Sequence, residues 1–156
     1  MYGPRFARCK QVRDELVSNV DFMPTFLETA GIDAPLGLHG TSLVPLLNGD
    51  TPAWRSAVCI QNRLGKDGQK ENVTSRGVRT RDWKLILRDS IPERGEHLRE
   101  LYSHINDPLE HNTIYGRQNA ETISSLLLEM DYWARQIDDK KAINLSAECA
   151  RDLELA

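Results

Sequence analysis

Cysteine is scarce in this sequence, and none of it is paired by spacing. The three cysteines, Cys9, Cys59 and Cys149, form no C-x-x-C pair, and no histidine lies near them at the spacing of a zinc site. We therefore expect neither a disulfide framework nor a structural zinc ion. Cys59 lies in the apolar run AVCI and is predicted to be a small core residue.

Long hydrophobic runs and an excess of positive charge are also absent. No apolar run is long enough to span a membrane, and residues 1–11 lack the hydrophobic centre of a signal peptide. The net charge of -3 gives no electrostatic reason to bind nucleic acid or an anionic membrane. With 28% charged and 40% hydrophobic residues, the 156-residue chain has the composition of one globular domain.

The signatures of a self-contained active site are missing as well. The sequence contains no H-E-x-x-H motif, no G-x-S-x-G motif and no glycine-rich phosphate loop. Its carboxylates do not cluster as a hard divalent cation would require. The histidines are scattered over predicted turns and loops: His39, His97, His104 and His111. We therefore assign no catalytic residue and no metal ligand.

Residues 76–87, RGVRTRDWKLIL, are predicted to form the centre of the fold. Their alternation of apolar and polar residues indicates two short antiparallel strands that turn at residues 81–82. Lys84 and Arg88 should face water, although Ile86 on the same side predicts partial cover. The opposite, covered side should carry Val78, Thr80, Trp83, Leu85 and Leu87.

Helical spacing of apolar residues predicts two helices. The first should run from near Asp21 to Gly31, with Pro24 in its first turn. The second should span 119–137 and cover the hairpin. The apolar face of the first helix is Val20, Met23, Phe26, Leu27 and Ala30, and that of the second is Ile123, Leu126, Leu127, Met130, Trp133 and Ile137.

Shorter elements and connections complete the prediction. Strands are expected at 57–61 and 99–102. Proline and glycine predict a surface connection over 32–56, with one helical turn around Leu43, Leu46 and Leu47. The segments 62–75 and 89–98 are predicted polar loops, and a short helix is possible at 142–155.

The ordered motifs VSNVDFMPTFLETAGI, LHGTSLVPLLNG, WRSAV, RGVRTRDWKLI and ELYSHINDPLEHN, followed by an amphipathic helix, resemble the C-terminal part of the type I sulfatases. These enzymes share the alkaline phosphatase superfamily fold. The resemblance implies an α+β fold, in which a small antiparallel sheet of about four strands packs against a long C-terminal helix. It divides the chain into an irregular lead-in (1–15), a helix and connection from the end of a large α/β domain (16–56), the C-terminal subdomain (57–137) and a charged tail (138–156).

The resemblance also implies chemistry that this sequence does not contain. Sulfatases use a formylglycine made from the cysteine of a C-x-P-x-R or C-x-A-x-R motif, beside a calcium or magnesium ion. The stretches 9–13 and 59–63 keep the cysteine and arginine, but both have glutamine at the middle position and are interpreted as coincidence. We expect the chain to be part of a longer sulfatase and inactive alone. Family members are often periplasmic, secreted or lysosomal, and the compartment of this chain is not predicted.

The resemblance further implies that the small subdomain lies beside the active-site cleft. We therefore expect the loop that starts at Gln61, Asn62 and Arg63 to contact a sulfated small molecule or sugar. Arg63 could hold an anionic sugar or a second sulfate by paired hydrogen bonds, and a solvent-exposed loop arginine is the alternative.

Two other interpretations stay open at this point. One is the C-terminal part of a related phosphonate or phosphodiester hydrolase, which only the upstream nucleophile and pocket would distinguish. The other is a free-standing interaction module. In that case the helix at 17–30 would expose its apolar face and favour homo-oligomers.

Overall fold

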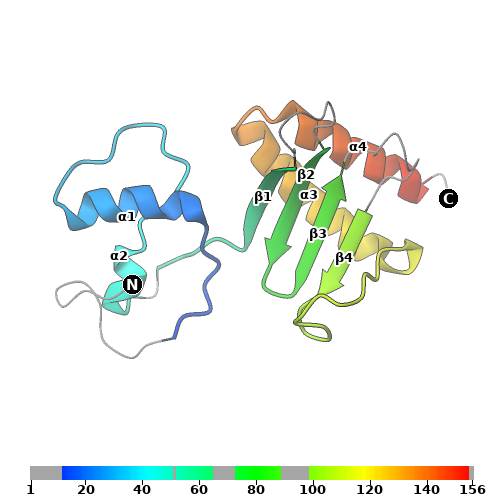
Figure 1. The fold of residues 1–156 in the computed structure, drawn as a ribbon, viewed down its shortest axis with the longest axis horizontal. Helices are drawn as coiled ribbons and strands as arrows, with labels where there is room; N and C mark the ends of the chain where they lie inside the picture. Colours follow the sequence, from blue (N-terminus) through cyan, green and yellow to red (C-terminus); the bar gives the residue numbers. More distant parts are fainter. Residues whose placement is uncertain (1–11, 51, 65–72, 89–98, 155–156) are drawn as a thin grey trace. The chain divides into compact units, whose positions relative to one another are not determined.

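The computed structural model describes residues 12–50, 52–64, 73–88 and 99–154 (Figure 1). The chain forms two compact units, Met1–Ser56 and Ala57–Ala156. Within the described ranges, the first unit contains only helices, and the second contains all the strands together with the two longer helices.

The first unit contains two short helices, and its main helix begins as the sequence predicts. A 3-10 turn, η1 (Asn19–Asp21), leads into α1 (Phe22–Thr29), and α2 (Val44–Asn48) follows. Pro24 lies in the first turn of α1, where its missing N–H costs no helical hydrogen bond. Gly31 follows the helix with a positive φ of 68°, a conformation that glycine adopts at little cost.

A buried carboxylate holds the first unit together. Asp21 is fully buried, and its two oxygens accept hydrogen bonds from the Arg55 guanidinium at 2.7 and 2.9 Å. The same oxygens accept the backbone N–H groups of Ser18 (2.7 Å) and Thr41 (2.9 Å). Burial alone would raise the pKa of Asp21, but the bonds from Arg55, Thr41 and Ser18 outweigh it and lower the pKa. One side chain therefore ties the start of α1 to two distant loops.

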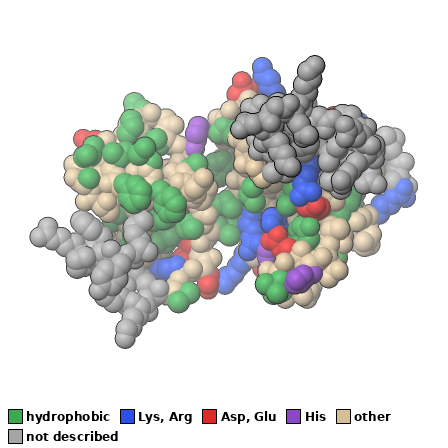
Figure 2. Space-filling view, in the orientation of Figure 1, with side chains coloured by type: hydrophobic (Ala, Val, Ile, Leu, Met, Phe, Trp, Pro, Cys, Tyr) green, Lys and Arg blue, Asp and Glu red, His purple; other side chains and the backbone are tan. Residues whose placement is uncertain are grey.

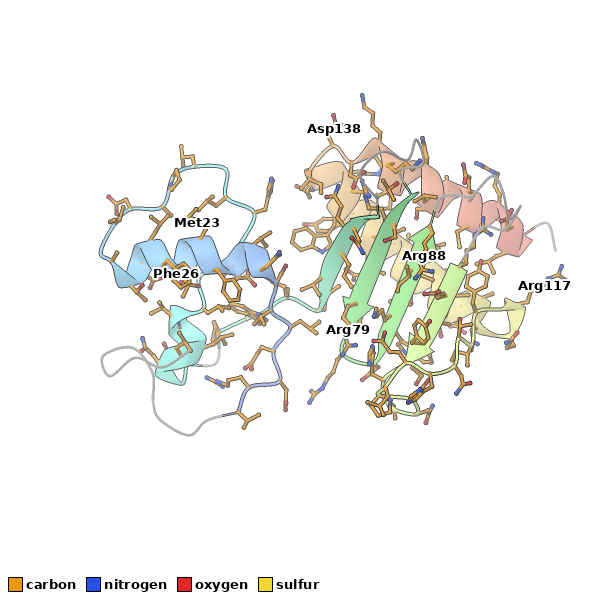
Figure 3. The ribbon with its side chains drawn as sticks, viewed as in Figure 1. Met23, Phe26, Arg79, Arg88, Arg117 and Asp138 are labelled. Carbon is orange, nitrogen blue, oxygen red and sulfur yellow. The ribbon has the colours of Figure 1, made fainter. Side chains whose placement is uncertain are left out.

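The apolar face predicted for α1 is open to solvent. Val20, Met23 and Phe26 are 48%, 56% and 56% exposed, while Pro24 and Thr25 are the buried residues of the helix. Figure 2 shows hydrophobic side chains gathered over this part of the chain, and Figure 3 labels Met23 and Phe26. We call the exposed residues Val20, Phe22, Met23 and Phe26 the α1 patch.

The second unit is a four-stranded antiparallel meander covered on one face by helices (Figure 1). Its strands are β1 (Ala57–Leu64), β2 (Val73–Thr80), β3 (Trp83–Arg88) and β4 (Arg99–Ser103), in the spatial order β1-β2-β3-β4. A 3-10 turn, η2 (Arg117–Asn119), precedes α3 (Ala120–Gln136), and α4 (Lys140–Glu154) ends the described chain. The α+β class and the sheet of four strands are confirmed. No described helix is long and apolar enough to cross a membrane.

The predicted hairpin is the middle of this sheet. Strands β2 and β3 pair with Val78 opposite Leu85 and Arg79 opposite Lys84, and they turn at residues 81–82. Val78, Leu85 and Leu87 are buried, as the alternation predicts. The core that they form with the helices consists of Ala57, Val78, Leu85, Leu87, Leu101, Ile123, Leu126, Leu127, Met130, Leu145 and Cys149.

The structure corrects three predictions in this unit and confirms one. Within the segment 138–156, assigned from the sequence to a charged tail with a short helix at 142–155, α4 (Lys140–Glu154) is that helix. Its residues at 142, 145 and 149 are buried, because their spacing of three and four gathers them on one face. Cys59 is exposed, because β1 is an edge strand. The predicted loop 62–75 is shorter, since β1 and β2 extend into it at both ends. Ile137 caps α3 and is exposed.

A second ion pair, which is partly buried, fixes α4 to the sheet. The Arg76 guanidinium on β2 donates to both carboxylate oxygens of Asp139, from Nε at 2.5 Å and from Nη2 at 3.3 Å. Asp139 directly precedes α4 and also accepts the backbone N–H of Ala142 at 3.1 Å, which makes it the N-cap of that helix. Burial raises the pKa of Asp139, and the bonds from Arg76 and Ala142 reverse this and lower it.

Substitution of Asp139 should separate its two roles. Asp139→Asn keeps a capping oxygen but removes the charge opposite Arg76, and we expect it to lower the free energy of unfolding of the second unit by about 1–3 kcal/mol. Asp139→Ala also removes the cap and should cost about 1 kcal/mol more. Urea unfolding followed by hydrogen exchange of residues 99–154 measures both losses. Equal stability of Asp139→Asn and the parent chain would show that the pair contributes nothing.

Candidate functional site

The residues predicted to meet substrate lie in a strand and not at the start of a loop. Gln61, Asn62 and Arg63 belong to β1, where they pair with Arg76, Ser75 and Thr74 of β2. Gln61 and Asn62 are exposed, and as neighbours in a strand they lie on opposite faces of the sheet. The strand therefore does not bring these two side chains to a common ligand, and a role in recognition remains a prediction.

A charged network that the sequence did not predict lies on the sheet face without helices. Glu110, from the turn after β4, forms ion pairs with Lys84 of β3 and with Arg79 of β2 (3.7 Å). His104 lies 3.3 Å from the same carboxylate by its Nε2 and 2.8 Å from Arg79 by its Nδ1. Figure 3 labels Arg79 and Arg88, which lie toward opposite ends of this face.

Hydrogen bonds within the turn hold Glu110 in place. Asp107 accepts the backbone N–H of Asn112 at 2.8 Å, and this bond is the main reason that the pKa of Asp107 is lowered. Glu110 itself has a positive φ of 57°, which is uncommon for a residue with a side chain. The motif NDPLEHN is the predicted turn around Pro108, and it also places the Glu110 carboxylate beside Arg79 and Lys84 of the sheet.

Each of the three basic side chains in this network faces a carboxylate, and Arg79 and Lys84 share that of Glu110. Arg88 donates to both oxygens of Glu100, at 2.8 and 3.1 Å, and Arg79 and Lys84 already face Glu110. Burial and the neighbouring Arg79 lower the pKa of His104, so its imidazole is neutral at neutral pH. Within the described part of this face, the pairing of charges therefore indicates a structural role.

The described residues do not fit the formylglycine and metal centre of a sulfatase. They contain no group of three or more potential metal ligands. Cys59 lies in a regular strand opposite Val78, and although it is exposed, the protein atoms around its sulfur desolvate the thiol and raise its pKa to about 11, with Glu129 and Asp139 adding to the rise. The other motif, at Cys9, lies outside the described residues. No reaction step is therefore derived through these groups.

The fold is that of the C-terminal region of sulfatases, as comparison with solved structures shows. The structure of BT4656 in complex with its substrate D-glucosamine-2-N,6-O-disulfate superimposes with a TM-score of 0.64 at 32% sequence identity, over 78% of this chain and 24% of that chain. A sulfatase structure from Bacteroides thetaiotaomicron, BT33494S-sulf, gives a TM-score of 0.75 over 94% of this chain and 32% of that one; at 23% identity this match supports the fold alone.

Sequence comparison leads to a particular family. Residues 1–136 match the model of the family "N-sulphoglucosamine sulphohydrolase, C-terminal". The N-acetylglucosamine-6-O-sulfatase of Bacteroides thetaiotaomicron is 36% identical over 120 residues, which are 73% of this chain and 20% of the relative. An endo-4-O-sulfatase of the same organism is 32% identical over 141 residues, 83% of this chain and 27% of the relative. The chain belongs to this C-terminal sulfatase family, and it spans between a fifth and a third of the length of these relatives.

Proposed function

We propose that this chain is the C-terminal part of a sulfuric ester hydrolase and that it does not hydrolyse sulfate esters by itself. The observation that carries the proposal is the family match over 1–136. The named relatives are sulfatases, which favours sulfate over phosphonate or phosphodiester chemistry. The sequence lacks the C-x-P-x-R or C-x-A-x-R motif from which sulfatases make their formylglycine.

The proposed substrate of the whole enzyme is a sulfated amino sugar. Two relatives support this class: the N-acetylglucosamine-6-O-sulfatase by its name, and BT4656 by its bound glucosamine disulfate. In a whole enzyme, calcium or magnesium and the formylglycine would come from outside the residues described here. This chain would contribute fold and substrate selection.

We propose that the end of β1 takes part in that selection through Arg63. The test is a chimera in which this chain replaces the matching C-terminal segment of the N-acetylglucosamine-6-O-sulfatase. We expect Arg63→Ala in the chimera to raise KM for a disulfated amino sugar by about tenfold, the loss of one charged hydrogen-bonding partner, with little change for the monosulfated sugar.

The control for this experiment is Arg117→Ala, which removes an exposed arginine of η2 far along the chain from β1. It should leave KM unchanged for both sugars. If Arg63→Ala also leaves both values unchanged in an active chimera, residue 63 has no part in recognition. If the chimera is folded but hydrolyses neither sugar, the proposed substrate class itself is contradicted.

We propose that the α1 patch is a contact surface. In a whole sulfatase it would pack on the large domain; in the isolated chain it would bring copies together as homo-oligomers. Its support is the half exposure of Met23 and Phe26, since a patch of this kind on a monomer usually marks an interaction site.

A further inference from the structure

The two edges of the sheet in the second unit are finished differently. The outer edge of β4 is covered by the segment that follows it. The backbone N–H of Ile114 donates to the carbonyl of Leu101 at 2.8 Å, and the N–H of Leu101 donates to the Thr113 hydroxyl at 3.1 Å. In the part of the chain that the structure describes, no backbone hydrogen bond between elements reaches the outer edge of β1.

Strand β1 also lacks the features that usually protect an open edge. It pairs with β2 residue for residue over all of Ala57–Leu64, without a bulge. Residues 57–62 include no proline and no charged side chain, and the first charge comes at Arg63. Natural edge strands are normally short, bulged, or interrupted by lysine or proline, because a regular free edge pairs with other strands. Within the described residues of the second unit, this edge is therefore available for strand addition.

The residues of β1 are complementary to a second, antiparallel copy of themselves. Consider pairing centred on Cys59: Val58 of each copy then lies opposite Ile60 of the other copy, and Ala57 lies opposite Gln61. Cross-strand pairs of β-branched residues stabilise antiparallel sheets. Val58 is half-buried and Ile60 is 37% exposed in the single chain, so the pairing would cover apolar surface as well as the free backbone groups.

We propose that two copies of this chain associate through β1, antiparallel and centred on Cys59, so that their four-stranded sheets form one continuous sheet. The partner is a second copy because the pattern Val58-Cys59-Ile60 is complementary to itself in this register and carries no charge that would oppose like pairing. This proposal uses residues other than those of the α1 patch, and it does not depend on the sulfatase function proposed above.

The test uses the full chain with Met23→Lys and Phe26→Lys, which remove association through the α1 patch. We expect this background to remain a dimer in sedimentation velocity, with hydrogen exchange of residues 57–64 slowing as concentration rises. Adding Ile60→Lys should weaken the dimer at least about tenfold. Leu128→Lys, at a 73% exposed position of α3, is the matched control and should leave the dimer intact.

Crosslinking gives a second measurement that does not depend on the folding of an edge variant. The substitution Cys9→Ser is added to the same background. Of the two remaining cysteines, Cys149 is fully buried, so Cys59 is the thiol that can react. A short bis-maleimide adds one thiol across each of its double bonds, so at a mildly alkaline pH, which offsets the raised pKa of the Cys59 thiol, it should join Cys59 to Cys59 of the second copy. Three results would each overturn the proposal. The Met23→Lys, Phe26→Lys chain could be a monomer at all concentrations, Ile60→Lys and Leu128→Lys could have equal effects, or the chain could dimerise without forming the Cys59 crosslink.

Discussion

Replacing Gly40 by alanine is expected to unfold the first unit while the second unit stays intact. A Cβ atom at position 40 would lie 2.0 Å from the carbonyl oxygen of Val20, 2.5 Å from its carbonyl carbon and 2.9 Å from the backbone nitrogen of Asp21. These are backbone atoms of η1, directly before α1, so no side-chain rotation can relieve the clash. We expect a loss of at least about 3 kcal/mol in the stability of the first unit.

Hydrogen exchange read separately for residues 16–50 and 73–154 measures this loss. Gly37→Ala is the matched control: it places a methyl group where nothing lies within 4 Å, at a glycine with φ of 89°. Its cost should be only the strain of a left-handed alanine, about 1 kcal/mol. If Gly40→Ala costs no more than Gly37→Ala, the close approach of residue 40 to Val20 is not a feature of the folded protein.

The second large effect is expected for Asp21→Asn. The amide would keep one acceptor oxygen but would turn N–H groups toward Arg55 or Ser18, which are themselves donors. It would also leave the Arg55 guanidinium without its charge partner beside a fully buried group. Removing one partner of a buried ion pair typically costs about 3–5 kcal/mol, and we expect a loss in this range for the first unit.

The pH dependence of stability gives an independent check on Asp21. Its pKa is lowered in the folded protein, so its contribution is complete above the unfolded value of about 3.9 and is lost as the pH falls through the folded value. Asp21→Asn should remove this part of the acid destabilisation. Asp33→Asn, at an exposed loop position, is the control and should leave the stability at neutral pH as in the parent chain. Parallel acid unfolding of the Asp21→Asn variant and the parent would contradict the role of this carboxylate.

Elements defined by local pattern were predictable from sequence. The hairpin around residues 81–82 and the helix α3 follow from alternation and helical spacing within a few residues, and the structure has both. The start of α1 near Asp21 followed from the position of Pro24. These features need no knowledge of distant parts of the chain.

Features that depend on distant pairing were missed. Asn62 and Arg63 were predicted to lie in a loop because they are polar, yet pairing with β2 extends the strand through them. Asp21 was recognised as a possible helix cap, but its bonds to Arg55 and Thr41 link residues 34 and 20 positions apart. The helix α4 was expected, but its packing on the core was not, since its many charges leave only a narrow apolar face. The spacing of residues 142, 145 and 149 was the signal that could have revealed this packing.

The ion pair between Arg76 and Asp139 lies beyond the end of the family match but within the folded second unit. The family match ends at residue 136, one residue before the turn that leads to Asp139. The folded core does not end there, because Leu145 and Cys149 of α4 pack in the same cluster as the hairpin. The part of this chain that the family model matches is therefore shorter than the part that forms the core of the second unit, and a chain cut at residue 136 would lack the helix that completes this core.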